Sequence, residues 1–100
     1  MYGLIGQIVT AAGRRSELAT ILATMGEMPG CLSYVVANDT TRDDALWVTE
    51  VWESAEAHAA SLELPEVRAL IEQGRPLIRG FGTRVETQPV GGFGLEPVGE

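Results

Sequence analysis

The chain has 100 residues, of which 45% are apolar, and this is enough for one domain with a modest hydrophobic core. Its net charge of -7 repels the phosphates of nucleic acids and of anionic membranes, so we expect no nucleic-acid partner and no membrane partner. The single cysteine, Cys31, excludes an internal disulfide. The sequence also has no long apolar run and no signal-peptide pattern, so we expect a cytoplasmic location.

The first part of the sequence predicts a strand, a helix and a second strand. Tyr2–Thr10 is rich in Ile and Val, as is typical of a β-strand. Four apolar residues then have the spacing of an amphipathic helix: Leu18, Ile21, Leu22 and Met25. We expect Gly26 to end this helix in a left-handed cap. A Pro-Gly turn leads into Cys31–Asn38 as the second strand, and the polar residues Asn38–Asp44 predict a hairpin loop.

The second part predicts a strand, two short helices and a last strand. Ala45–Glu53 is the third strand. Ser54 can cap a short helix that ends near Leu62. Pro65–Gly74 has a proline suited to the first helical position and a glycine that can end the helix. The alternating pattern of Arg79–Pro89 predicts the fourth strand.

This order, β-α-β-β-α-β, indicates an α+β fold of the ferredoxin-like kind over residues 1–90, with a four-stranded antiparallel sheet and helices on one face. Apolar residues occupy both faces of the first and third strands, yet the helices can cover only one face. Soluble monomers avoid such an exposed patch, so we expect a homodimer with the open sheet faces packed together as a dimeric α+β barrel. The Gly/Pro-rich tail, residues 91–100, is either a disordered end or an arm on the partner subunit.

Few groups in the sequence can carry out chemistry. One histidine and one cysteine cannot supply a zinc site, and the carboxylates lack the spacing of a calcium loop, so we expect no metal. The sequence also lacks the glycine motifs that bind dinucleotides or nucleotide phosphates, and the nucleophile elbow of serine hydrolases. A proton-transferring side chain beside aromatic surface remains.

The join between the third strand and the next helix carries Trp52 and the only histidine, His58. His58 lies three residues from Ala55 and four from Leu62, so we expect it on their apolar face, turned toward the sheet. There it can act as a general acid or base, or serve as a structural histidine bonded to a backbone carbonyl. Trp52 is expected under the helix as core or as a cavity wall. Trp47 faces the opposite side of the sheet, and strand parity leaves open which tryptophan lies nearer the helices.

Several polar strand residues could hydrogen-bond a phenol or carbonyl group, although each has a structural interpretation too: Gln7, Tyr34, Asn38 and Glu50. Arg79 and Arg84 could stabilise a developing anion, or simply be solvated at a strand end. Three short segments, Met28–Cys31, Glu50–Ser54 and Leu64–Val67, occur in an order and spacing that resemble the antibiotic biosynthesis monooxygenase family, which includes quinol monooxygenases. The resemblance extends over nearly the whole chain.

The resemblance implies a monooxygenase that oxidises a small aromatic, quinol or polyphenolic substrate with molecular oxygen and without metal or flavin. It implies His58 and Trp52 as the catalytic candidates, with His58 the base and Trp52 shaping the cavity. The candidates for substrate binding are Tyr34, Gln7, Ser61 and Asn38. Many members have a histidine where this chain has Ser61, so His58 is displaced by almost one helical turn. On the same dimeric fold, the alternatives are a non-catalytic small-ligand-binding module and a polyketide-type cyclase or isomerase.

Overall fold

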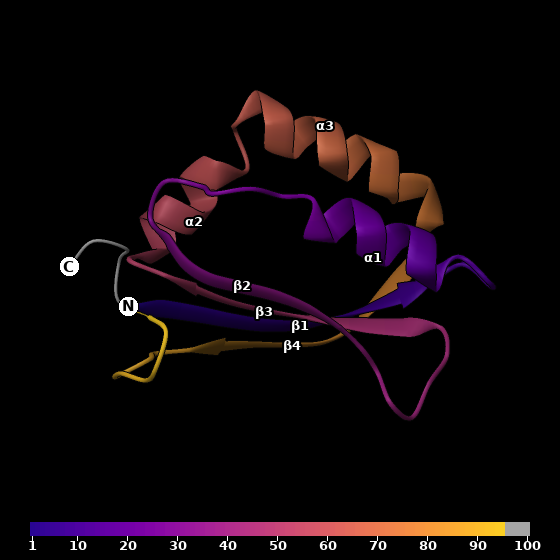
Figure 1. Cartoon of the computed structure of the whole chain (residues 1–100), viewed down its shortest axis with the longest axis horizontal. Helices are drawn as coiled ribbons and strands as arrows, with labels where there is room; N and C mark the ends of the chain where they lie inside the picture. Colours follow the sequence, from indigo (N-terminus) through magenta and orange to yellow (C-terminus); the bar gives the residue numbers. More distant parts are fainter. Residues whose placement is uncertain (96–100) are drawn as a thin grey trace.

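A computed structural model describes residues 1–95 and confirms the predicted βαββαβ order of an α+β ferredoxin-like fold. The strands are β1 (Tyr2–Thr10), β2 (Cys31–Asn38), β3 (Ala45–Trp52) and β4 (Ile78–Thr87). The helices are α1 (Arg15–Ala23), α2 (Ala55–Ser61) and α3 (Pro65–Gly74), and a 3₁₀ turn, η1 (Arg75–Leu77), follows α3. Figure 1 shows all three helices on one face of the sheet. No helix within the described residues is long and apolar enough to cross a bilayer.

The sheet is antiparallel, with the strand order β2-β3-β1-β4, so β2 and β4 form its edges. In the register of β1 with β3, Tyr2 pairs with Trp52 and Ile8 pairs with Leu46. The N-terminal residues therefore lie beside the join between β3 and α2, although 50 residues separate them in sequence. The side of the sheet that carries Leu46, Val48 and Trp52 is buried under the helices.

Two apolar clusters hold the helices to the sheet. The first joins α1 to the middle of the sheet through Leu18, Leu22, Leu46, Val48 and Leu77. The second lies under α2 and α3 and consists of Met28, Trp52 and Val67. Burial of large apolar side chains is the main driving force for this packing, at about 25 cal/mol per Å² of apolar surface. Trp52, which is 1% exposed, is the largest of the fully buried side chains.

The two tryptophans lie on opposite faces of the sheet, and the structure shows that Trp52 faces the helices. Trp47 lies on the open face beside Gln7, its partner in β1. The Asp39 carboxylate accepts hydrogen bonds from Trp47 Nε1 (2.8 Å) and Gln7 Nε2 (3.1 Å). Bonds from the backbone N–H and hydroxyl of Thr41, together with these two, hold the pKa of Asp39 well below its usual range. Asp39 thus fixes the orientation of polar side chains on the open face.

Most predicted boundaries are accurate to one or two residues, but the expected cap of the first helix is wrong. Helix α1 ends at Ala23, and Thr24 follows in a right-handed helical conformation, with its hydroxyl donating to the Ile21 carbonyl oxygen (2.6 Å). Because this local bond ends the helix first, Gly26 forms no cap and has no positive φ. By contrast, Ser54 caps α2 as predicted, since its Oγ accepts a bond from Ala57 N–H (3.0 Å).

Candidate functional site

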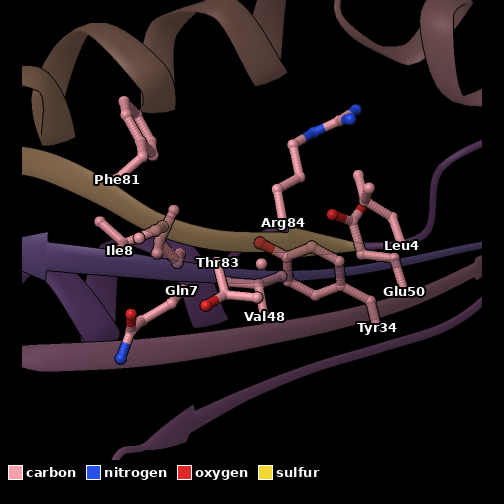
Figure 2. A pocket seen from close by; sticks show the side chains of 12 residues that line it. Leu4, Gln7, Ile8, Tyr34, Val48, Glu50, Phe81, Thr83 and Arg84 are labelled. Carbon is pink, nitrogen blue, oxygen red and sulfur yellow. The ribbon is translucent and has the colours of Figure 1, made fainter. Parts of the chain in front are cut away.

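A cavity of about 250 Å³ lies between the helix-facing side of the sheet and the helices. Its apolar lining comes mainly from two strands and α1, through Leu4 and Ile8 of β1, Val48 of β3 and Leu22 of α1. The polar or charged side chains that line it are Gln7, Thr83 and three that face the helices, Tyr34 from β2, Glu50 from β3 and Arg84 from β4 (Figure 2). An apolar cavity with a few convergent polar groups is the usual form of a small-molecule site.

The register of the sheet explains why these polar groups meet. Tyr34 pairs with Glu50 across β2 and β3, while Glu50 pairs with Leu4 of β1. Arg84 pairs with Gly6 of β1, whose missing side chain leaves room between Arg84 and the neighbouring strands. Paired residues of an antiparallel sheet point to the same face, so all three polar groups point toward the helices. In Figure 2 the Tyr34 ring lies in front of the strands, and the Arg84 side chain extends from β4 toward the side of the helices.

The Tyr34 hydroxyl is held in its protonated form. Burial, with smaller contributions from the negative charge of Glu50 and from Cys31, raises the pKa of Tyr34 to about 12. At neutral pH the hydroxyl can therefore donate a hydrogen bond to an oxygen atom of a ligand, but it cannot serve as a base. This property suits Tyr34 to hold an anionic substrate oxygen.

An ultraviolet titration of tyrosinate absorbance tests the Tyr34 environment. Of the two tyrosines, Tyr34 should ionise near pH 12, and Tyr34→Phe should remove that step from the titration curve. Because the pKa is 10.0 in the unfolded chain and higher in the folded one, this contribution to stability is complete below pH 10 and is lost as the pH rises through 12. Ionisation of both tyrosines below pH 10 would contradict the described burial.

Next to the cavity, Glu50, Trp52 and His58 form a fixed cluster. Trp52 Nε1 donates a hydrogen bond to Glu50 Oε1 (3.0 Å), and His58 Nε2 lies 3.9 Å from the same oxygen. The His58 ring packs edge-on against Trp52, with 5.4 Å between ring centroids, and Tyr2 covers it at 5.7 Å. The side chains of His58 and Glu50 are 17% and 14% exposed. Glu50 lines the cavity and His58 does not, so the carboxylate stands between the imidazole and the cavity.

His58 faces the sheet as expected, but the residues predicted to share its face are wrong. Ala55 is exposed and Leu62 is 44% exposed. The buried side of α2 instead carries Ala57, which packs against Trp52, and Ser61, which is 4% exposed. A spacing of three residues places Ser61 beside His58 just as well as Ala55, and the large ring of Trp52 determines which side of the helix is covered.

The other predicted binding residues are dispersed. Ser61 Oγ donates a bond to the His58 carbonyl oxygen (2.6 Å) and lines a separate hollow beside Gly30 and α2. Asn38 is exposed at the end of β2, away from the cavity lining. Gln7 reaches the lining, yet its amide is bonded to Asp39 on the open face. The structure therefore gathers Tyr34 and Glu50 around the cavity, with Trp52 and His58 behind them.

Two cavity residues, Glu50 and Arg84, gave only weak signals in the sequence. A signal for Glu50 exists, because it is the one charged residue in the alternating series Leu46, Val48, Glu50, Trp52 that faces the helices. The position of Arg84 depends on the register of β4, which no local pattern specifies. Within residues 1–95, no three His, Cys, Asp or Glu side chains gather in a way that could hold a metal ion.

Comparison with known proteins identifies the family of this chain. The family model described as antibiotic biosynthesis monooxygenase matches residues 1–73. A crystal structure of a candidate antibiotic biosynthesis monooxygenase from Chloroflexus aurantiacus is 52% identical, with a TM-score of 0.91, and the match covers 95% of this chain and 98% of that chain. A comparison with curated protein sequences gave no match.

More distant structures share the fold. A candidate antibiotic biosynthesis monooxygenase from Deinococcus radiodurans is 20% identical, with a TM-score of 0.76 over 97% of this chain and all of that chain. Another from Nitrosomonas europaea is 13% identical, with a TM-score of 0.76 over 90% of this chain and 99% of that chain. The match to the family model and the similarity to the Chloroflexus protein show that this chain belongs to the antibiotic biosynthesis monooxygenase family.

Proposed function

We propose that this protein is a cofactor-independent monooxygenase that oxidises a small aromatic, quinol or polyphenolic substrate with molecular oxygen. Membership of the family supports a monooxygenase-type function in general. One observation supports the specific reaction, namely that a carboxylate backed by an imidazole faces an arginine and a protonated tyrosine around an apolar cavity. These groups suit the formation of a substrate anion, which is the species that reacts with oxygen.

In the first proposed step, the Glu50 carboxylate removes a proton from an activated C–H or phenolic O–H group of the substrate. His58 Nε2, 3.9 Å from Glu50 Oε1, then accepts this proton and restores the carboxylate. The bond from Trp52 Nε1 keeps the carboxylate oriented during the transfer. A base placed within reach of its substrate accelerates proton transfer by about 10²–10⁴-fold. The resemblance implied His58 as the base; in this proposal Glu50 takes the substrate proton and His58 accepts it from Glu50.

The negative charge that develops on the substrate oxygen is stabilised by two donors, Arg84 and Tyr34. The Arg84 guanidinium supplies a positive charge at the mouth of the cavity, and the Tyr34 hydroxyl supplies a hydrogen bond. Such donors act strongly where the surroundings are apolar, because little water competes with them. Leu4, Ile8 and Val48 provide these surroundings.

The oxygen step balances without a further reductant. For an activated CH₂ group, loss of one proton gives an enolate, whose electron pair forms a C–O bond to molecular oxygen. Protonation of the terminal oxygen gives a hydroperoxide. Loss of the second C–H proton then breaks the O–O bond, so that the carbon becomes a carbonyl and the other oxygen atom leaves as water. The carbon loses two electrons when the C–O bond forms and two more when the carbonyl forms. Molecular oxygen accepts all four.

Oxygen uptake with quinol and anthrone-type substrates tests this function. We expect the purified protein, treated with a chelator, to consume oxygen in the presence of such a substrate, and His58→Ala to reduce the rate by about tenfold or more. If the protein binds these substrates but none of them leads to uptake, it is a ligand-binding module. If it converts a substrate to an isomer without uptake, it is a cyclase or isomerase. Either result would refute the monooxygenase proposal.

The proposed assembly is a homodimer formed through the open sheet face. This face presents a cross-strand row of Val35, Thr49, Ile5 and Val85, of which Val35 and Val85 are exposed. We propose that the tail is an arm on the partner subunit, because Phe93 in the tail and Val90 directly before it are exposed. Of the two other apolar residues of the tail, Leu95 is half-buried and the valine at position 98 lies outside the described residues.

Light scattering tests the assembly. The expected mass is twice the 10.7 kDa of one chain. Val35→Glu should give a monomer, because it places a charge within the apolar row of the open face, whereas Thr20→Glu on the exposed side of α1 should leave the dimer intact. A monomeric wild-type protein at micromolar concentration would contradict the proposal.

A further inference from the structure

We propose that Phe81 is a specificity-determining residue whose ring closes the cavity over a flat aromatic substrate and stacks on it. Phe81 is 75% exposed, which is unusual for so large an apolar side chain. It pairs with Ile8 in the register of β1 with β4, so it lies on the helix-facing side of the sheet. Figure 2 shows its ring rising from β4 at the edge of the cavity. This inference rests on the proposed function in one respect, namely that the substrate binds in the cavity.

The surroundings of Phe81 leave its ring room to move. It lines the cavity on one side and, on the other, a second hollow of about 290 Å³ formed with Ile71, Ile78 and Arg79. The side chain therefore stands between two spaces and can occupy either by rotation about its χ1 angle. An aromatic ring poised in this way can cover a ligand in the cavity or turn aside to admit it.

The backbone that carries Phe81 is specialised. Glycines flank it at positions 80 and 82, and the register of β4 shifts between the pairs Gly6–Arg84 and Ile8–Phe81, which marks a β-bulge in this edge strand. A side chain at Gly82 would collide with the amide oxygen of Gln7, so any larger residue there would have to displace the Gln7 side chain. Bulges commonly redirect a side chain next to a functional site. Here the bulge, held against Gln7, directs Phe81 toward the cavity.

The dimensions and charges define the substrate class. A dry cavity of about 150 Å³ holds a benzene molecule, so about 250 Å³ is suited to one substituted ring or two fused rings. The ring would lie between Phe81 and Tyr34, and an anionic oxygen would face Arg84. Stacked aromatic pairs gain more affinity than contact area alone provides, equivalent to about three- to tenfold in the dissociation constant. Phe81 should therefore favour planar aromatic anions over saturated ones of the same size.

Calorimetric titration with two probes, 2-naphthoate and its saturated counterpart decahydro-2-naphthoate, tests this inference. We expect the wild-type protein to bind 2-naphthoate more tightly, and Phe81→Ala to reduce the ratio of the two affinities by about three- to tenfold. Phe81→Tyr should retain the ratio, whereas Phe81→Leu should lose it despite its similar bulk. Leu62→Ala is the matched control, because Leu62 is an exposed apolar residue that lines neither the cavity nor the open sheet face.

Two results would overturn the inference. One is a wild-type protein that binds neither probe or does not distinguish them. The other is a Phe81→Ala variant that keeps the wild-type ratio of the two probe affinities. This holds even if the variant differs from the wild type in oligomeric mass. Because binding of these probes requires no oxygen, the result is independent of turnover. Probe binding that depends on Phe81, together with no oxygen uptake from any quinol or anthrone-type substrate, would refute the monooxygenase proposal and leave the role of Phe81 intact.

Discussion

Glu50→Gln is expected to reduce the kcat of oxygen uptake by about a hundredfold or more. Glutamine has the shape of glutamate and can still accept the bond from Trp52 Nε1, but it cannot take up the substrate proton. The cavity and its apolar lining should be unchanged, so the dissociation constant of an unreactive aromatic probe should stay within a few-fold of the wild-type value. Steady-state oxygen uptake and probe titration on the same preparations measure the two effects separately.

A matched control for this variant is Glu86→Gln. Glu86 lies on the same side of the sheet, where it accepts a hydrogen bond from the Tyr2 hydroxyl (2.6 Å), but it does not line the cavity. Its replacement changes the net charge equally and should leave kcat nearly unchanged. If Glu50 and His58 pass one proton between them, the double variant Glu50→Gln/His58→Ala should be no slower than Glu50→Gln alone. A Glu50→Gln variant with wild-type kcat would contradict the proposed proton transfer.

Trp52→Ala is expected to cause the largest loss of stability of any single substitution discussed, about 3–5 kcal/mol in the free energy of unfolding. Trp52 is 1% exposed and packs with Met28 and Val67 under α2 and α3, so its removal leaves a cavity at the centre of the second core cluster. For a domain of this size, the loss corresponds to a fall of more than about 12 °C in Tm. Denaturant unfolding at a fixed protein concentration measures it.

Two further variants complete this test. One separates packing from hydrogen bonding at Trp52, and the other is a control at an exposed position. Trp52→Phe keeps most of the buried surface but removes the donor to Glu50, so it should lose less stability than Trp52→Ala while still reducing kcat. Leu62→Ala, at a position that is 44% exposed next to α2, should change the free energy of unfolding by well under about 1.5 kcal/mol. A loss below about 1 kcal/mol for Trp52→Ala would be inconsistent with its described burial.

The fold could be predicted from the sequence because its signals are local. The apolar spacing of Leu18 and Leu22 specified a helix, and both residues are buried in the first cluster. Ser54 specified the start of α2 through a bond within one helical turn. The failed cap at Gly26 has the same origin, since the competing bond from the Thr24 hydroxyl is also local and leaves no distinct pattern in the sequence.

The site could be predicted only in part, because its geometry depends on long-range pairing. Trp52 and His58 are near in sequence, and their contact follows from a strand that leads directly into a helix. Tyr34 and Glu50 meet only through the register of β2 with β3, and Arg84 joins them only through the register of β4 with β1. The β-bulge at Gly82 shifts that register and turns Phe81 toward the helices, which an alternating pattern alone cannot predict.

In the proposed function, one atom of molecular oxygen is inserted into a small aromatic substrate in the cavity that Glu50 lines. The most direct measurement uses isotope-labelled oxygen gas with the purified protein, a quinol or anthrone-type substrate and a chelator, followed by mass spectrometry of the product. We expect one labelled oxygen atom in each product molecule and the other in water. A product without label, with the consumed oxygen recovered as hydrogen peroxide, would contradict it.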